Sequence, residues 1–291
     1  MNELQERLQN VENGAGMFSG NNEITTIDFD LEMLKSANEM FSGCENLKCV
    51  NSNMPALKNG CRMFYNNVNL ESFKGNLSSL ENGYFMFSLC RNLTSFNENM
   101  EELVYGHCMF MFDVFLTDFT SDCSKLAYAE NMFKFCGFNS FNKSFPSLKN
   151  GRNMFRQCIR LESYTADTPN LLYGGNMFKE CKKLTKFEGN LNKLLDGEAM
   201  FDGCKELTSF KSNLCALRNG HNMFRGCKLD MESLKHISET IAIVESGCIT
   251  LGTLPDNEEV KEIIDSIRNR GWDVIVDDRL YVGNDSFAIS F

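Results

Sequence analysis

The chain has 291 residues and a formal net charge of −10, which argues against nucleic acid or an anionic membrane as a general partner. Both partners require clustered positive charge on the protein. Its thirteen cysteines accompany a polar N-terminus without an apolar signal segment, so we expect reduced thiols rather than a disulfide framework. No apolar run approaches the roughly 18 residues that cross a bilayer, so we expect no membrane insertion.

Residues 1–13 predict a short helical segment. Leu4, Leu8 and Val11 recur at helical spacing within an otherwise charged stretch. This segment either caps the elements that follow or contacts a partner chain.

Residues 14–228 contain one repeated phrase. A Met-Phe pair occurs ten times, spaced by 23 residues except for one interval of 22. The pairs begin at Met17, Met40, Met63, Met86, Met109, Met132, Met154, Met177, Met200 and Met223. The single deletion lies between Cys136 and Phe141. A repeat of this length indicates a solenoid, because one unit cannot bury its own apolar face but stacked units can.

Aligned on that pair, the unit reads MFxxCxxLxxFxxxLxxLxxGxx. The Met, Phe and Cys positions would share one side of a short helical or 3₁₀ turn. The LxxF stretch predicts a short strand, and the small residue three before each Met predicts a turn. We therefore expect an α/β solenoid of about ten coils with a parallel β-sheet on one face.

These residues resemble the BspA-like class of leucine-rich repeat, with its phrase small residue-Phe-x-x-Cys-x-x-Leu-x-x-Ile. This chain has Met where that class usually has Ala, Phe in place of Ile, and lacks the usual Ile-Pro after the strand. The resemblance implies a leucine-rich-repeat solenoid over about residues 14–230 and, for function, an adhesin, a surface protein or a phage product.

The cysteine column is interpreted as structural. Equivalent residues on successive coils have parallel Cβ vectors, which is poor geometry for a disulfide, and the chain has no CxxC pair for zinc. His107, His221 and His236 occur singly and suggest no catalytic group. We therefore predict no catalytic residue, no metal ligand and no cofactor.

A column of Asn and Asp follows each expected strand and permits two interpretations. It is either a calcium- or sugar-binding stripe or a ladder of side chains that satisfies backbone groups at a corner, and we favour the ladder. Its members are Asp30, Asn53, Asn76, Asn99, Asp122, Asp167, Asn190 and Asn213.

The exposed face of the strands is the candidate binding face, because solenoids commonly use such faces for extended recognition. A solvated sheet face without a ligand is the alternative. The candidate residues are Thr94, Ser95, Asn97, Thr117, Asp118, Thr120, Glu162, Ser163, Thr165, Thr185, Lys186, Glu188, Thr208, Ser209 and Lys211. A second set of aromatic residues, near the small-residue column, could form a contact patch on the helical face or pack against an adjacent subunit. Its members are Tyr84, Phe85, Tyr105, Tyr128 and Tyr173.

Residues 229–291 predict an α/β capping module. "LDMESLKHISETIAIV" has helical periodicity, and "CITLG" and "WDVIV" have the composition of strands. Between them, Pro255 is expected to start a second helix, and "RLYVGNDSFAISF" contributes one or two further strands. This tail resembles a closing segment of leucine-rich-repeat structural proteins of gut bacteriophages.

That resemblance implies a non-enzymatic protein associated with a virion, assembled in the host cytoplasm, on the tail or as a head decoration. Its partners would be a protein or glycan on a cell surface, or other virion subunits. A bacterial surface or secreted adhesin is the alternative, and an enzyme on a repeat scaffold is a third reading that would require a convergent polar cluster.

Overall fold

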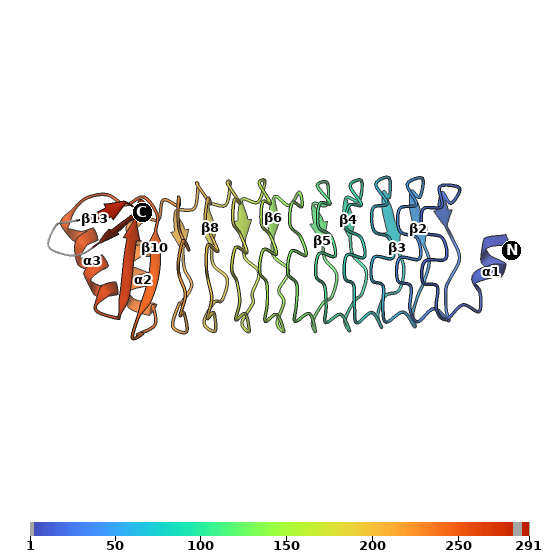
Figure 1. Ribbon diagram of the computed structural model, residues 1–291, viewed down its shortest axis with the longest axis horizontal. Helices are drawn as coiled ribbons and strands as arrows, with labels where there is room; N and C mark the ends of the chain where they lie inside the picture. Colours follow the sequence, from blue (N-terminus) through green and yellow to red (C-terminus); the bar gives the residue numbers. More distant parts are fainter. Residues whose placement is uncertain (1–2, 282–286, 291) are drawn as a thin grey trace. The chain divides into compact units, whose positions relative to one another are not determined.

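The computed structural model describes residues 3–281 and 287–290 (Figure 1). The contacts between residues divide the chain into two units, Met1–Phe138 and Asn139–Phe291. The boundary falls inside the repeat that is one residue short. The predicted division into 1–13, 14–228 and 229–291 is a different partition, and it stays a prediction.

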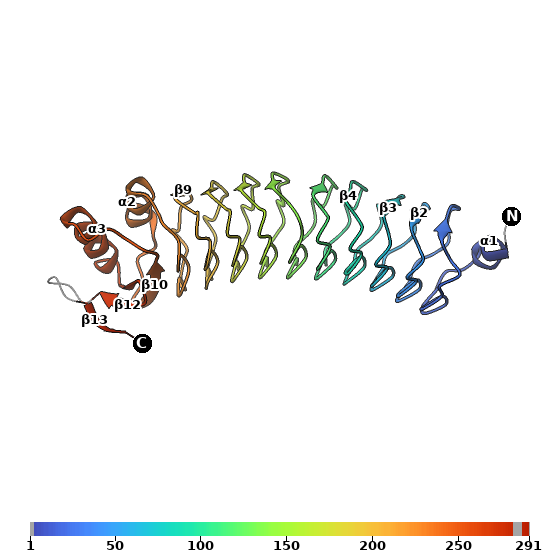
Figure 2. The same ribbon diagram turned by 90° about the horizontal axis from the view of Figure 1, so that it is seen from above.

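The first unit contains one helix and five short strands. The helix α1 spans Glu3–Leu8 and is shorter than the segment expected from sequence. The strands are β1 (Thr26–Ile27), β2 (Cys49–Asn51), β3 (Ser72–Lys74), β4 (Ser95–Phe96) and β5 (Asp118–Phe119). They pair in parallel within two sheets, β1-β2-β3 and β4-β5. Each strand residue lies opposite its equivalent in the next repeat, as Phe96 lies opposite Phe119. Figure 2 shows these strands on one edge of successive coils.

The second unit continues the repeat and ends in a mixed α/β module. Its coil strands are β6 (Ser140–Phe141), β7 (Ser163–Tyr164), β8 (Lys186–Phe187) and β9 (Ser209–Phe210), again parallel. The module contains α2 (Met231–Thr240), β10 (Gly247–Leu251), α3 (Glu258–Arg268), β11 (Trp272–Val276), β12 (Arg279–Tyr281) and β13 (Phe287–Ser290). Its sheet has the order β10-β11-β12-β13, parallel for the first pair and antiparallel for the others.

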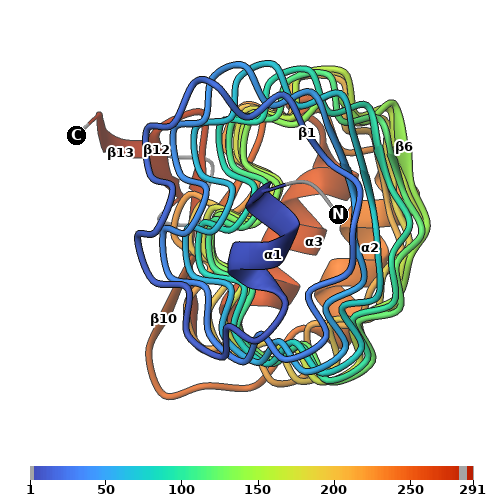
Figure 3. The same ribbon diagram turned by 90° about the vertical axis from the view of Figure 1, so that its right-hand side faces the viewer.

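The module forms where the sequence patterns place it, with one correction at the start of α3. Asn257 is the N-cap, and its side chain accepts a hydrogen bond from the Val260 amide at 3.0 Å. Pro255 therefore precedes the helix rather than starting it. The apolar face of α3 is buried, and the Trp272 indole donates to the carbonyl of Ala242 at 2.8 Å. In Figure 3, looking along the stack, β6 and β10 lie on opposite sides of the second unit.

The segment around each Met-Phe pair is a run of turns, and the expectation of a helical turn is wrong. In the coil of Met63, the Met63 amide donates to the carbonyl of Gly60, while the Phe64 amide donates to Met86 of the next coil at 2.9 Å. In every coil the residue before the Met and the third residue after it have positive φ, as in Asn66 at 60°. Such regular left-handed positions break an α-helix and let alternate amides bond between coils.

The small-residue column is explained by packing, not by backbone conformation. A Cβ built on Gly60 would lie 2.7 Å from the sulfur of Met86 in the next coil, and one on Gly83 would lie 2.8 Å from that of Met109. Neither glycine has positive φ. The long Met side chain of each coil therefore needs a small residue in the coil before it.

The core consists of two interlocking ladders of aromatic rings. In the second unit, Phe155 stacks on Phe178 and Phe178 on Phe201, with ring centroids 5.5 Å apart. The strand residues Tyr164 and Phe187 form the other ladder and meet the first edge to face. Offset-stacked and edge-to-face pairs are the favourable geometries of aromatic rings, so each coil fixes the register of its neighbours.

Among the residues that the structure describes, no helix is long and apolar enough to cross a membrane.

Candidate functional site

We call the side of the coils that carries the short strands, β1–β5 in the first unit and β6–β9 in the second, the strand side. In the first unit, it presents the candidate residues of two adjacent coils to solvent. Thr94, Ser95 and Asn97 lie on one coil, and their exposed counterparts on the next coil are Thr117, Asp118 and Thr120. The Thr120 hydroxyl donates to the side chain of Asn97 at 2.8 Å. Because side chains alternate along a strand, Ser95 and Asp118 point outward while Phe96 and Phe119 enter the core. Thr94 and Thr117 precede the strands and are exposed as well.

In the second unit, the strand side carries three coils of similar groups mixed with charge. All of its predicted members are exposed or half-buried: Glu162, Ser163, Thr165, Thr185, Lys186, Glu188, Thr208, Ser209 and Lys211. The Thr185 hydroxyl donates to the carbonyl of Glu162 at 3.1 Å, and the Thr208 hydroxyl donates to that of Thr185 at 3.4 Å. The structure therefore places the candidate residues of each unit on one side, as arrays that recur from coil to coil. Whether they bind a ligand stays a prediction.

The Asn and Asp column at the corner after the strand is a ladder of backbone caps. The Asp30 carboxylate accepts from the Asn53 amide at 2.8 Å, and the Asn53 side chain accepts from the Asn76 amide at 3.1 Å. The side-chain oxygen of Asn190 accepts a hydrogen bond from the backbone amide of Asn192 within the same corner. These oxygens serve the chain itself, which supports the ladder interpretation.

All seven cysteines of the column are buried. The Cys204 thiol donates to the carbonyl of Phe178, in the preceding coil, at 3.1 Å. Cys181 and Cys227 donate in the same way to the carbonyls of Phe155 and Phe201. Burial raises the pKa of Cys204 well above its usual value, so the thiol stays protonated and able to donate. The structural interpretation of the column is thus supported by the partners of the thiols.

Three positions of this column in the first unit hold other residues, namely Asn21, Asn67 and Asp113. Asn67 and Asp113 replace cysteine and are fully buried. Neither carboxyl oxygen of Asp113 has a hydrogen-bond partner, because the adjacent amides of Leu89 and Cys90 already donate to backbone carbonyls. Burial raises the pKa of Asp113 well above its usual value, against a smaller lowering by those two amides. Burial therefore favours the neutral carboxylic acid of Asp113 over its carboxylate, at a position that elsewhere holds a thiol.

We call the side of the coils formed by the turns around the Met-Phe pairs the turn side. In the first unit, the predicted aromatic residues outside the repeat pattern gather there. The Tyr105 and Tyr128 rings stack with centroids 5.5 Å apart, and Tyr84 contacts Phe85 at 4.6 Å and His107 at 6.2 Å. Tyr105 is 48% exposed. In the second unit, Tyr173 instead lies under the guanidinium of Arg152, at 5.5 Å. The predicted contact patch is thus a real cluster only for the residues of the first unit.

A Cys-His pair that the sequence analysis missed lies on the turn side of the second unit. The sulfur of Cys248 is 3.7 Å from Nδ1 of His221. The two residues meet because β10 bonds to the last coil at Gly220 as a further coil would. Burial, and then the Asp273 carboxylate, raises the pKa of Cys248, which is the opposite of what a nucleophilic thiol requires.

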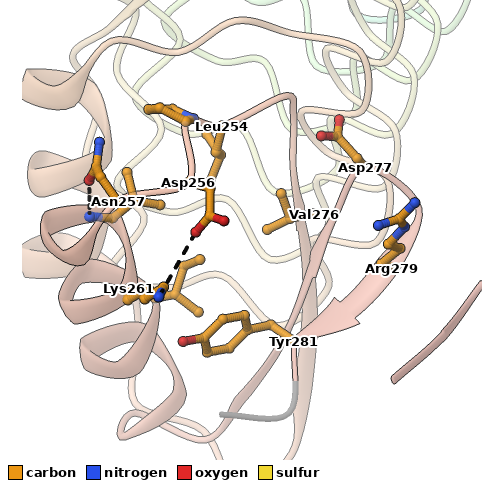
Figure 4. Close-up of a pocket in the computed structure, with 11 residues that line it drawn as sticks. Leu254, Asp256, Asn257, Lys261, Val276, Asp277, Arg279 and Tyr281 are labelled. Carbon is orange, nitrogen blue, oxygen red and sulfur yellow. Dashed lines mark hydrogen bonds and ion pairs between the residues drawn. The ribbon is translucent and has the colours of Figure 1, made fainter. Parts of the chain in front are cut away.

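The terminal module contains a pocket of about 400 Å³ between α3 and the strands β11 and β12 (Figure 4). Its wall is partly apolar, through residues such as Val260 and Val276, and partly charged. Three of the charged groups have local partners. Lys261 lies 4.0 Å from the carboxylate of Asp256, and Asp277 accepts from the hydroxyl of Thr253 at 2.9 Å. No sequence pattern had pointed to these residues.

The described residues contain no group of three or more His, Cys, Asp or Glu side chains that would hold a metal ion. The polar groups instead recur once per coil. Recurrence suits an extended ligand or a protein surface better than a small molecule held at one point.

The sequence profile of the BspA type leucine rich repeat region matches residues 3–112 and 127–250 in six copies. The chain belongs to the BspA-type leucine-rich-repeat family. This confirms the resemblance seen in the repeat phrase. No curated protein matches the chain.

Among solved structures, a leucine-rich-repeat protein from Bacteroides ovatus ATCC 8483 is similar, with 18% identity and a TM-score of 0.58. The similarity covers 91% of this chain and 78% of that one, and it confirms the leucine-rich-repeat solenoid fold. A leucine rich cell surface protein from Faecalibacterium prausnitzii A2-165 also matches, with 16% identity, a TM-score of 0.46, and coverage of 94% of this chain and 84% of that one. At that score the second match adds no argument.

Proposed function

We propose that this BspA-type leucine-rich-repeat protein is a non-enzymatic binding protein that acts at a cell surface and recognises its partner through the strand side. The observation that carries the proposal is the recurrence of exposed polar groups over the repeating core of each unit. Glu162, Thr185 and Thr208 occupy the same position on three successive coils, and all three are exposed. An extended ligand can contact all three, whereas a catalytic centre needs different groups converging on one atom.

The pairing of Cys248 with His221 does not favour an enzyme, because the thiol pKa is raised rather than lowered. The proposal therefore gives that pair no catalytic role.

The role in a virion remains a prediction of the sequence analysis. Neither the family nor the solved structures reported above bear on a bacteriophage. The strand side could serve a virion protein or a bacterial surface protein equally well, so the experiment below tests the binding side first.

The test compares bulky substitutions on two sides of the same two coils. Thr185→Tyr with Thr208→Tyr enlarges the strand side at positions where tyrosine is well tolerated in a sheet. Asn192→Tyr with Cys215→Tyr enlarges another exposed side of those coils. Binding is measured on printed arrays of defined neutral and acidic glycans and purified extracellular proteins.

We expect the wild-type protein to bind at least one of these ligands. The strand-side variant should lose that binding, and the variant on the other side should keep it. Equal binding by all three proteins would refute the strand side as the recognition surface, and no binding to any ligand class would refute the proposed function.

A further inference from the structure

Positive charge is concentrated in the coils of the second unit, although the chain as a whole is acidic. Residues 139–228 contain 15 Lys and Arg against 8 Asp and Glu. Residues 1–138 contain 9 against 18, and residues 229–291 contain 5 against 13. The formal net charges are therefore +7, −9 and −8, and the total of −10 conceals a basic segment.

Within this segment, three lysines occupy one position on three successive coils. Lys182, Lys205 and Lys228 each follow the buried cysteine of their coil, at the corner that leads into the strand side, and all three are exposed. We call them the lysine column. Lys205 and Lys228 have no ion-pair partner among the described residues, and Lys182 makes only an exposed pair with Glu180 at 3.4 Å. Stacking like charges one coil apart destabilises the free protein, so the column is better explained by an anionic ligand.

The lysine column is continuous with the strand side. The ammonium group of Lys183, next to Lys182, reaches across to the carboxylate of Glu162 at 3.5 Å. The ammonium group of Lys186, on β8, lies 3.7 Å from the carboxylate of Glu188. The side chains of both pairs are about half exposed. Exposed ion pairs contribute little to the stability of the folded protein. An incoming anion can therefore replace the glutamates with little loss of stability.

We propose that the lysine column and the adjoining strand side of the second unit bind an acidic polysaccharide that carries about one anionic group per sugar. Successive coils are separated by about 4.8 Å, the spacing of neighbouring strands, so the column offers one ammonium group per step. That step is close to the length of one sugar ring in an extended chain. The hydroxyls of Thr185 and Thr208, on the same coils, are placed to bond sugar hydroxyls.

Charge density favours a polysaccharide over nucleic acid. Duplex DNA carries one charge per ~1.7 Å and a single strand one per ~3.4 Å, both denser than the column. The interleaved Glu162, Glu188 and Glu206 would repel so dense a polyanion. Unstacked bases also require exposed aromatic side chains, and the strand positions of this unit expose Ser, Thr, Lys and Glu instead.

This inference rests on the proposed function and specifies its ligand class. The test measures binding to polygalacturonate, which has one carboxylate per sugar, with dextran as the neutral polymer and duplex DNA and polyglutamate as other polyanions. The test variant combines Lys182→Gln, Lys205→Gln and Lys228→Gln. The matched control combines Lys149→Gln, Lys193→Gln and Arg218→Gln, which change the net charge equally at exposed sites on another side of the same unit.

We expect wild-type protein to bind polygalacturonate in preference to dextran, DNA and polyglutamate. The test variant should weaken this binding about tenfold, or about 1.4 kcal/mol, and the control should change it little. Binding should also weaken as salt is raised, because exposed charges are screened. An equal loss in both variants, or equal binding of DNA or polyglutamate, would overturn the inference.

The two proposals can fail separately. Absence of polygalacturonate binding, together with loss of some other ligand in the Thr185→Tyr and Thr208→Tyr variant, would refute the acidic ligand and leave the proposed function standing.

Discussion

At the scale of single residues, Tyr164 is a polar interruption of an aromatic ladder. Its ring stacks between Phe141 and Phe187, but its hydroxyl is fully buried and has no hydrogen-bond partner. Burial raises the pKa of Tyr164, and the Asp167 carboxylate adds to this effect. An unsatisfied buried hydroxyl costs stability, so the phenylalanine found at this position in other coils should fit better.

Tyr164→Phe should therefore stabilise the protein by about 1 kcal/mol, which raises Tm by roughly 2–4 °C. Thermal unfolding followed by circular dichroism measures the change. Tyr173→Phe is the control, because Tyr173 is 40% exposed and its hydroxyl meets water. A Tm that falls in the Tyr164→Phe variant would show that the hydroxyl has a partner after all.

Asp113 should make stability depend on pH. Its pKa is raised in the folded protein, so the unfolded chain loses its proton first as pH rises above about 4. Stability is then lost progressively from that pH up to the folded pKa. Asp113→Cys, which restores the residue of the neighbouring coils, should stabilise the protein by about 1–3 kcal/mol at pH 7 and by less at pH 4.

Urea unfolding of both proteins at several pH values measures this difference. Asp118→Asn, which removes an exposed carboxylate from the same coil, should show no comparable trend. A stability difference between Asp113→Cys and wild type that is constant with pH would contradict the buried, neutral carboxyl group.

At the scale of the repeated element, Phe187 is the centre of the coil that contains β8. Its fully buried ring contacts Tyr164, Phe178, Phe201 and Phe210. Phe187→Asp would leave a cavity and a buried charge, so we expect a loss of at least about 4 kcal/mol. Ile159→Asp, at a side chain that is 56% exposed, should leave Tm nearly unchanged. An unaltered Tm for Phe187→Asp would remove the basis of the core assignment.

The strands and the terminal module could be predicted because their signals are local. Apolar residues at fixed spacing determine which side chains enter the core, and Asp230 and Asn257 cap their helices through their own side chains. The turn side was predicted wrongly because Met, Phe and Cys at helical spacing suit a helix as well as a run of turns. Only the left-handed residues distinguish the two, and positions such as Arg62 or Phe85 are occupied by residue types that do not favour that conformation.

At the scale of the whole molecule, the candidate binding face could be predicted only as an exposed side. Pattern alone separates outward from inward residues, but it cannot bring together residues of different elements. The Cys248–His221 pair and the pocket beside Lys261 depend on how β10 and α3 pack, which no repeat spacing encodes. The lysine column was visible in the sequence, but the net charge of the whole chain concealed it.

The central claim is that the strand side of the second unit and its lysine column form the binding surface. Lysine-specific acetylation followed by mass spectrometry, with and without polygalacturonate, tests it in the wild-type protein. We predict that the ligand slows the modification of Lys182, Lys205 and Lys228 while Lys149 and Lys193 react as before. Equal protection of all five, or protection only of lysines in the first unit, would contradict the claim.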